Sequence, residues 1–127
     1  MIMELSVEEV RDFITTKMII PFSELRLVPL RMKVSTAVEK YLKREPLTPS
    51  EARDLADYIL TYAENLTLNV YLHLKIRDLR EALAYREYTM SFLRKLRKLH
   101  RLCCKNPIRK HIELMIMLCL SQGIDPF

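Results

Sequence analysis

The sequence predicts an all-α fold, a compact bundle of five or six helices formed by a single domain over residues 1–127. Apolar residues recur at helical spacing through most of the chain, in segments that begin with recognisable capping residues. The chain contains one glycine, whereas average usage of roughly 7% would give about nine, and this shortage disfavours the glycine-dependent turns of β-hairpins. Strand-like alternation is confined to the short stretch NVYLHL, which lies inside a helical context.

The first third of the chain predicts two helices and a bent connector. Ser6 and Glu9 have the spacing of a capping box, in which each side chain accepts a hydrogen bond from the other residue's backbone N–H. A first helix of about three turns follows, with apolar positions at Val7, Val10, Ile14 and Met18. Segment 21–29, which is bounded by two prolines, is expected to be a connector. A second helix is expected over 30–43 and is ended by Pro46.

The strongest local signal is the run Thr48-Pro49-Ser50-Glu51, which combines a capping Thr, a Pro at the first helical position and a Glu at the third. It predicts a third helix that reaches about Asn65 and buries Ala52, Leu55, Ala56, Ile59 and Tyr62. A break or a kink is expected at Leu66-Thr67, followed by helices over 68–83 and 85–103. No glycine or proline separates these two helices, so a single continuous rod is an open alternative.

The last helix is predicted over 107–121. Asn106 is its expected cap, Pro107 its first residue, and Gly123 stands where a left-handed residue ends a helix. Apolar side chains surround most of this helix, at Ile112, Met115, Ile116, Met117, Leu118, Cys119 and Leu120. A terminal helix in a small bundle needs only one apolar stripe, so we expect 107–121 to form a homodimer contact or to bind a protein partner.

The positive charge of the chain is concentrated in one segment. Residues 88–112 contain eight Lys or Arg and no Asp or Glu, whereas residues 1–87 have a net charge of −1. On a helical wheel, five cations fall within an arc of roughly 100°, namely Arg94, Arg97, Lys98, Arg101 and Lys105. The opposite side carries an apolar stripe of Tyr88, Phe92, Leu96, Leu99 and Cys103. One helix is therefore expected to bury the stripe and to expose the cations.

A row of like charges repels itself, so a bound polyanion is a natural partner for it. The candidate nucleic-acid-binding residues are Arg94, Arg97, Lys98, Arg101, Lys105, Arg109 and Lys110. No base-reading motif accompanies them, so contacts to the phosphate backbone with little sequence preference are expected, to either RNA or DNA. The alternatives are a merely solvated face, an acidic protein partner, which would make the chain a protein–protein adaptor, or an anionic membrane.

The sequence gives little support to enzymatic chemistry. The phosphate loop, the dinucleotide fingerprint and the nucleophile elbow each need two or more glycines in a short span. No common zinc spacing is matched by His100, Cys103, Cys104 and His111, so we expect no metal. Because the glycine-dependent motifs are absent from the sequence as well, we expect no cofactor and no catalytic residue. One enzymatic alternative remains, because the spacing from Arg94 to His100 resembles the Arg-x(4–6)-His motif of HEPN-type ribonucleases. That resemblance implies RNA cleavage at a dimer interface.

Cysteine usage and hydropathy predict a cytoplasmic protein without membrane contact. Three cysteines are an odd number, and they lack paired spacing, which favours a reduced compartment. The longest uncharged run, residues 114–124, has about half the length that a membrane crossing needs. The N-terminal stretch MIMELSVEEV carries three glutamates and lacks the apolar core of a secretory signal.

Two segments carry a resemblance to a known family, LTPSEARDLADYIL with its capped start and PIRKHIELMIMLCLSQG with its apolar helix ending in glycine. Together with the overall layout, they resemble the small α-helical subunit of type III CRISPR ribonucleoprotein complexes. The resemblance is one of architecture over about the C-terminal two thirds of the chain. It implies a non-catalytic subunit that contacts nucleic-acid backbone through basic residues within a larger assembly.

Overall fold

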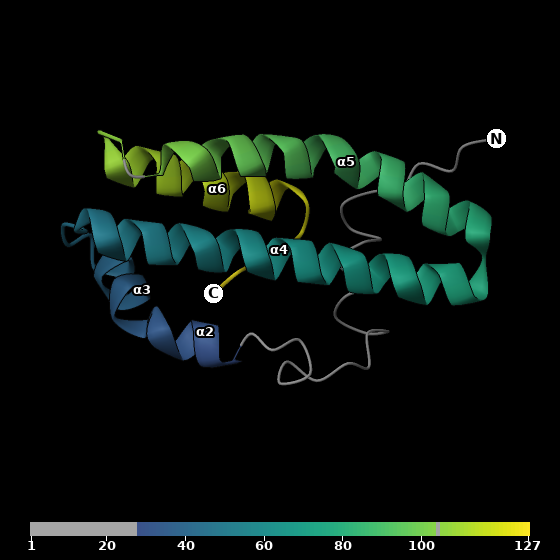
Figure 1. Ribbon diagram of the computed structural model, residues 1–127, viewed down its shortest axis with the longest axis horizontal. Helices are drawn as coiled ribbons and strands as arrows, with labels where there is room; N and C mark the ends of the chain where they lie inside the picture. Colours follow the sequence, from purple (N-terminus) through teal and green to yellow (C-terminus); the bar gives the residue numbers. More distant parts are fainter. Residues whose placement is uncertain (1–27, 104) are drawn as a thin grey trace.

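The computed structural model describes residues 28–103 and 105–127, and it confirms the all-α bundle. The described helices are α2 (Val28–Lys33), α3 (Ser35–Leu42), α4 (Pro49–Arg77), α5 (Leu79–Leu102) and α6 (Ile108–Ser121). No strand occurs within these ranges. Helices α4 and α5 form a long antiparallel hairpin, α6 packs against both of them, and α2 and α3 lie on the other side of α4 (Figure 1). The predicted first helix with its capping box at Ser6 and Glu9 lies outside the described residues, as does most of the predicted connector over 21–29.

The helix predicted over 30–43 is observed as two short helices, α2 and α3, separated by Val34. Backbone hydrogen bonds still run through this point, from the Val34 N–H to the Leu30 carbonyl at 3.2 Å and from the Val38 N–H to the Val34 carbonyl at 2.9 Å. Helix α3 ends at Leu42, and Arg44 then adopts a left-handed conformation with φ of 59°. The chain therefore turns before Pro46.

Helix α4 begins as predicted and continues further than predicted. The Thr48 hydroxyl accepts from the Glu51 N–H at 3.1 Å, and the Glu51 carboxylate accepts from the Thr48 N–H at 3.0 Å, which confirms the capping box. The expected end near Asn65 is wrong, because the helix passes through Leu66-Thr67 without a break. The Thr67 hydroxyl donates to the Ala63 carbonyl at 2.9 Å, so this buried side chain is satisfied by its own helix. Four of the five predicted core residues of α4 are buried, and Tyr62 is half-buried.

The break between the two long helices lies at Asp78, so the helix boundaries predicted at 83–85 and the continuous rod are both wrong. Asp78 has an extended backbone, with φ of −157° and ψ of 113°. Its carboxylate accepts from the Arg80 N–H at 2.8 Å, while its own N–H donates to the Leu74 carbonyl at 2.7 Å. One aspartate therefore ends α4 and caps α5, without any glycine or proline.

Helix α6 ends as predicted but begins one residue later than predicted. Pro107 is the residue before the first turn, and neither it nor Asn106 caps the helix with a side-chain hydrogen bond, so the predicted Asn106 cap is wrong. At the other end, Gly123 has φ of 73°. The Gly123 N–H donates to the Leu120 carbonyl and the Ile124 N–H to the Cys119 carbonyl, each at 3.0 Å, which is a Schellman motif.

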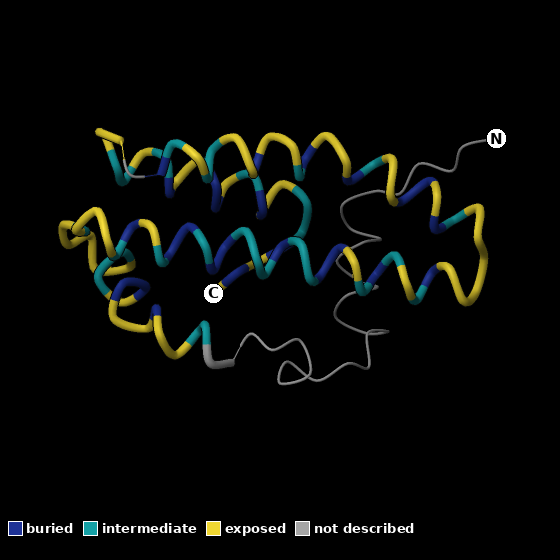
Figure 2. Tube along the Cα trace, in the orientation of Figure 1, coloured by how far each residue is buried: buried dark blue, intermediate teal, exposed yellow. Residues whose placement is uncertain are grey.

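Two apolar clusters of different size hold the described part of the chain together. The larger joins α3, α6, the first half of α4 and the second half of α5. The smaller lies between the remaining halves of α4 and α5 and has four buried members, Val70, Leu74, Ala82 and Tyr85. We call residues 67–90 the distal arm and the rest of the described chain the main bundle. Figure 2 shows the end of the distal arm as largely exposed.

Candidate nucleic-acid interface

The C-terminal half of α5 separates into the two faces that the helical wheel predicts. Phe92, Leu96 and Cys103 are buried against the main bundle, and Tyr88 and Leu99 are half-buried. Arg94, Arg97, Lys98 and Arg101 are exposed on the opposite side, as the wheel predicts. Lys105 is also exposed, but α5 ends at Leu102, so this cation lies in the loop after the helix and its predicted place on the same helical face is wrong. We call these five cations the basic face: Arg94, Arg97, Lys98, Arg101 and Lys105. Large side chains anchored in the core fix the rotation of α5, so the cations point to solvent because of the packing behind them.

One residue of the basic face has an acidic partner. The Arg97 Nε donates to a Glu64 carboxylate oxygen of α4 at 3.1 Å. Arg94, Lys98 and Arg101 make no ion pair with any described acidic residue. The negative end of the α5 dipole stabilises a cation in the last turn, such as Arg101, but not Arg94, which lies about two turns earlier. The fold therefore leaves most of this charge uncompensated.

Arg109 and Lys110, the remaining two candidates, belong to α6 and differ in their surroundings. The half-buried Arg109 guanidinium donates to the Tyr41 carbonyl at 3.1 Å and also to the Glu45 carbonyl. It lies 5.0 Å from the centre of the Tyr41 ring, in a cation–π contact. Arg109 therefore attaches the start of α6 to the end of α3, whereas Lys110 is exposed.

His100 of α5 is turned toward α4. Its Nε2 lies 2.5 Å from an Asp57 carboxylate oxygen, and 28% of the side chain is exposed. Positions six apart on a helix differ in direction by about 120°, so Arg94 and His100 do not share one side of α5. The hydrogen bond to Asp57 gives His100 a contact between helices that the sequence spacing does not reveal.

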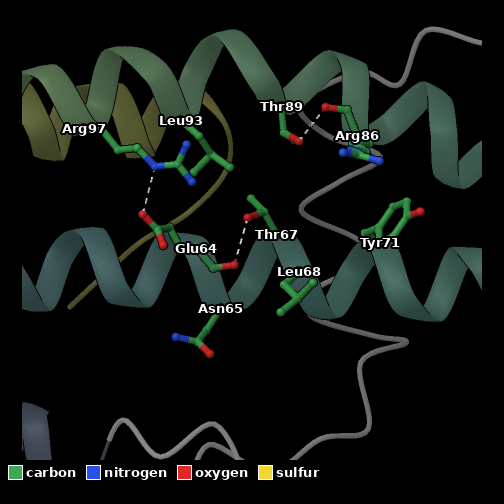
Figure 3. Close-up of a pocket in the computed structure, with 9 residues that line it drawn as sticks. All are labelled: Glu64, Asn65, Thr67, Leu68, Tyr71, Arg86, Thr89, Leu93 and Arg97. Atoms are coloured by element: carbon green, nitrogen blue, oxygen red, sulfur yellow. Dashed lines mark hydrogen bonds and ion pairs between the residues drawn. The ribbon is translucent and has the colours of Figure 1, made fainter.

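A hollow of about 440 Å³ opens between α4 and α5 beside the basic face. Its lining residues are Glu64, Asn65, Thr67, Leu68, Tyr71, Arg86, Thr89, Leu93 and Arg97. Figure 3 shows Arg97 and Arg86 toward opposite ends, with Leu93 between them and Tyr71 near Arg86. Sequence reasoning missed this hollow because its walls come from two helices whose register is set at Asp78. One sequence feature could have indicated the hollow, because Arg86 stands three helical turns before Arg97 and therefore on the same side of α5.

A second, more apolar hollow of about 530 Å³ lies between α5 and α6. Its walls include Lys95 and Lys98 of α5 and Leu114 and Met117 of α6. The residues predicted to surround the last helix divide between core and surface. Ile112, Met115, Ile116 and Cys119 are buried, Leu118 is half-buried, and Met117 and Leu120 are exposed. The expectation that the core has no place for all seven is confirmed.

The environments of the thiols and of the metal-ligating side chains are also defined. Burial raises the pKa of the Cys119 thiol to about 12, so this cysteine is a protonated core residue near neutral pH. Within residues 28–103 and 105–127, no three His, Cys, Asp or Glu side chains come together as a metal site. None of the helices described has both the length and the apolar character needed to cross a membrane.

Comparison with protein-family models, with curated proteins and with solved structures gives no match to this chain. The chain's own geometry and charge are therefore the basis for its proposed function.

Proposed function

We propose that this chain is a non-enzymatic, cytoplasmic helical subunit that binds nucleic-acid backbone through its basic face as part of a larger assembly. The observation that carries the proposal is the exposure of the five cations of the basic face and their small number of acidic partners. All five are exposed, four of them on one side of α5 and Lys105 in the loop that follows it. Among them, only Arg97 is paired with a described acid. Each like-charged pair one turn apart destabilises a helix by a few tenths of a kcal/mol, and bound phosphates would remove that repulsion.

The dimensions of the basic face suit several phosphates. Arg94 and Arg101 are seven positions apart within α5, which corresponds to about 10 Å along the helix axis. Phosphates of one strand in a duplex are spaced by about 3.4 Å along its axis, so the face reaches several of them. Contacts of this kind position the nucleic acid and carry no sequence information, so we expect weak sequence preference.

Charge reversal on and off the basic face tests the proposal. The Lys98→Glu/Arg101→Glu variant should lose at least about tenfold in affinity for oligonucleotides and show a shallower dependence of affinity on salt. The matched control is Lys75→Glu/Arg80→Glu, which changes the net charge equally at exposed cations of the distal arm. Fluorescence anisotropy over a salt series measures both variants. Equal losses in the two variants, or no binding by the wild type at low salt, would contradict the proposal.

The pairing of Arg97 with Glu64 gives a prediction of opposite sign. Glu64→Gln removes the acid that competes with phosphate for Arg97, so affinity should rise by a few-fold. Glu81→Gln is the control, because Glu81 pairs with Arg77 at 2.6 Å in the distal arm and the change in net charge is the same. Similar gains in both variants would mean that net charge, and not the basic face, determines binding.

A second candidate function is supported by the hollow between α5 and α6. Exposed Leu114 and Met117 lie beside Lys95 and Lys98, a combination that suits an amphipathic acidic segment of a protein partner. Self-association through 107–121 would use the same surface, and light scattering at micromolar concentration tests it. Nuclease treatment of the chain purified with its native partners separates the two functions. Partners held by nucleic acid are released, whereas a directly docked protein remains.

A further inference from the structure

The line of cations on α5 extends past the basic face and across the hollow between α4 and α5. Arg97 belongs to the basic face, and Arg86 lies about 16 Å further toward the start of α5, at the other end of the hollow (Figure 3). Arg86 is exposed and makes no ion pair with a described acid. A phosphate backbone that follows these cations therefore passes over the hollow.

The walls of the hollow suit the flat, partly apolar shape of a nucleobase. Leu68 and Leu93 line it from the two helices, and Tyr71 adds an aromatic ring. Glu64, which accepts from Arg97, also places a carboxylate at its edge, a group that accepts hydrogen bonds from base amino groups. The Asn65 amide points away from α5 and donates to the Thr61 carbonyl of its own helix at 2.8 Å. The volume of about 440 Å³ is within the usual range of ligand pockets.

Bases differ in their access to such a hollow. In a duplex they are paired and stacked inside the helix, whereas in a single strand they are free to turn outward and stack on aromatic side chains. We infer that the chain binds single-stranded nucleic acid, with phosphates along the basic face and at Arg86 and with a base in the hollow against Tyr71. This inference rests on the proposed function and specifies its ligand.

Anisotropy with four labelled 15-mers of equal charge per strand tests the inference: single-stranded DNA, single-stranded RNA, an abasic DNA strand and a DNA duplex. At least one of the base-bearing single strands should bind at least about tenfold more tightly than the abasic strand and the duplex do. Tyr71→Ala should lower the affinity for that strand about tenfold, because stacking of a base on one aromatic side chain contributes on this scale. The same variant should leave the affinity for the duplex within about twofold of the wild type. Tyr71→Phe should retain the affinity.

Two matched controls separate the hollow from the stability of the arm. Tyr88→Ala removes a ring that packs on the same small cluster as Tyr71 but does not line the hollow. Leu68→Glu and Leu72→Glu alter exposed leucines one turn apart, of which only Leu68 lines it. We expect Tyr71→Ala and Leu68→Glu to weaken binding of the single strand, and Tyr88→Ala and Leu72→Glu to leave it within about twofold.

The outcomes distinguish this inference from the proposed function. If the duplex or the abasic strand binds as tightly as the base-bearing strands, and Lys98→Glu/Arg101→Glu weakens that binding, the inference is overturned and backbone binding stands. Equal effects of the hollow variants and their controls would overturn it as well. If no probe binds at low salt, both are overturned.

Discussion

The main bundle and the distal arm are built from the same two long helices, yet they differ in how much packs against them. In the main bundle, α3 and α6 enclose the hairpin, and residues such as Ile59 and Leu96 are fully buried. In the distal arm, four buried residues form the cluster, while leucines and an isoleucine stand exposed on the described surface. These exposed residues are Leu68, Leu72, Ile76, Leu79 and Leu83.

The difference shows which part of the fold can support a charged surface rigidly. Four of the five cations of the basic face lie on the half of α5 whose opposite side is anchored in the larger core, so they share a rigid support. The hollow lies where the two regions meet, between Arg97 on one side and Arg86 on the other. We expect the basic face to be the more rigid end of the site and the Arg86 end to be the more mobile one.

The largest expected effect compares the same truncation in the two regions. Leu96→Ala removes a side chain that is 0% exposed in the larger core, and should cost about 3–5 kcal/mol of unfolding free energy. Leu74→Ala removes one that is 3% exposed in the four-residue cluster, and should cost about 2–3 kcal/mol because the thinner surroundings relax more easily. Urea denaturation measures both free energies, and a larger loss of unfolding free energy for Leu74→Ala would contradict this difference between the two regions.

A smaller effect compares the two helix caps. Thr48→Ala removes one half of the reciprocal capping box at the start of α4, and should cost about 1 kcal/mol. Asp78→Ala removes the side chain that caps α5 at the tip of the arm, and should cost less in global stability because this end can open without unfolding the bundle. Hydrogen exchange of the amides near Asp78 should rise in that variant, whereas those of the first half of α4 should not change.

The smallest effect concerns the acid side of the pH scale. The hydrogen bond from Lys40 lowers the pKa of Glu51 from its ordinary value of 4.5, with a further contribution from the Thr48 backbone. A carboxyl whose pKa is lower in the folded state stabilises the fold above its unfolded pKa, and this stabilisation disappears as pH falls through the folded pKa. Lys40→Met should therefore raise the pKa of Glu51, as read from its NMR titration, and reduce the sensitivity of stability to acid below about pH 4.5.

Elements with local chemical signals were predictable from the sequence. The Thr48–Glu51 cap and the glycine at 123 specify their own hydrogen bonds, so both were located correctly. Leu66-Thr67 was misread because Thr67 satisfies its hydroxyl within the helix. The break at Asp78 was missed because an aspartate flanked by Arg77 and Leu79 also fits a helical surface, and only the antiparallel packing of α4 on α5 selects the break.

The candidate site divides in the same way. Helical periodicity alone predicted the exposed cations of α5, because both faces belong to one helix. It did not predict the contacts that depend on a second helix. These are the pair of Glu64 with Arg97, the pair of Asp57 with His100, and the hydrogen bonds from the Arg109 guanidinium to the carbonyls of Tyr41 and Glu45. Distances of 33 to 68 residues along the chain separate these partners, beyond the reach of any local pattern.

The chain has one glycine, Gly123, and it stands at a position with positive φ. The scarcity of glycine elsewhere affects the conformational entropy of the unfolded chain. Glycine widens the range of backbone conformations available before folding, and each replacement by alanine at a compatible position stabilises a protein by about 0.4–1 kcal/mol through that range alone. A chain of this length with average composition would have about eight more glycines. The unfolded ensemble is correspondingly narrower, by roughly 3–8 kcal/mol of conformational entropy, so the backbone gives up less freedom when it folds.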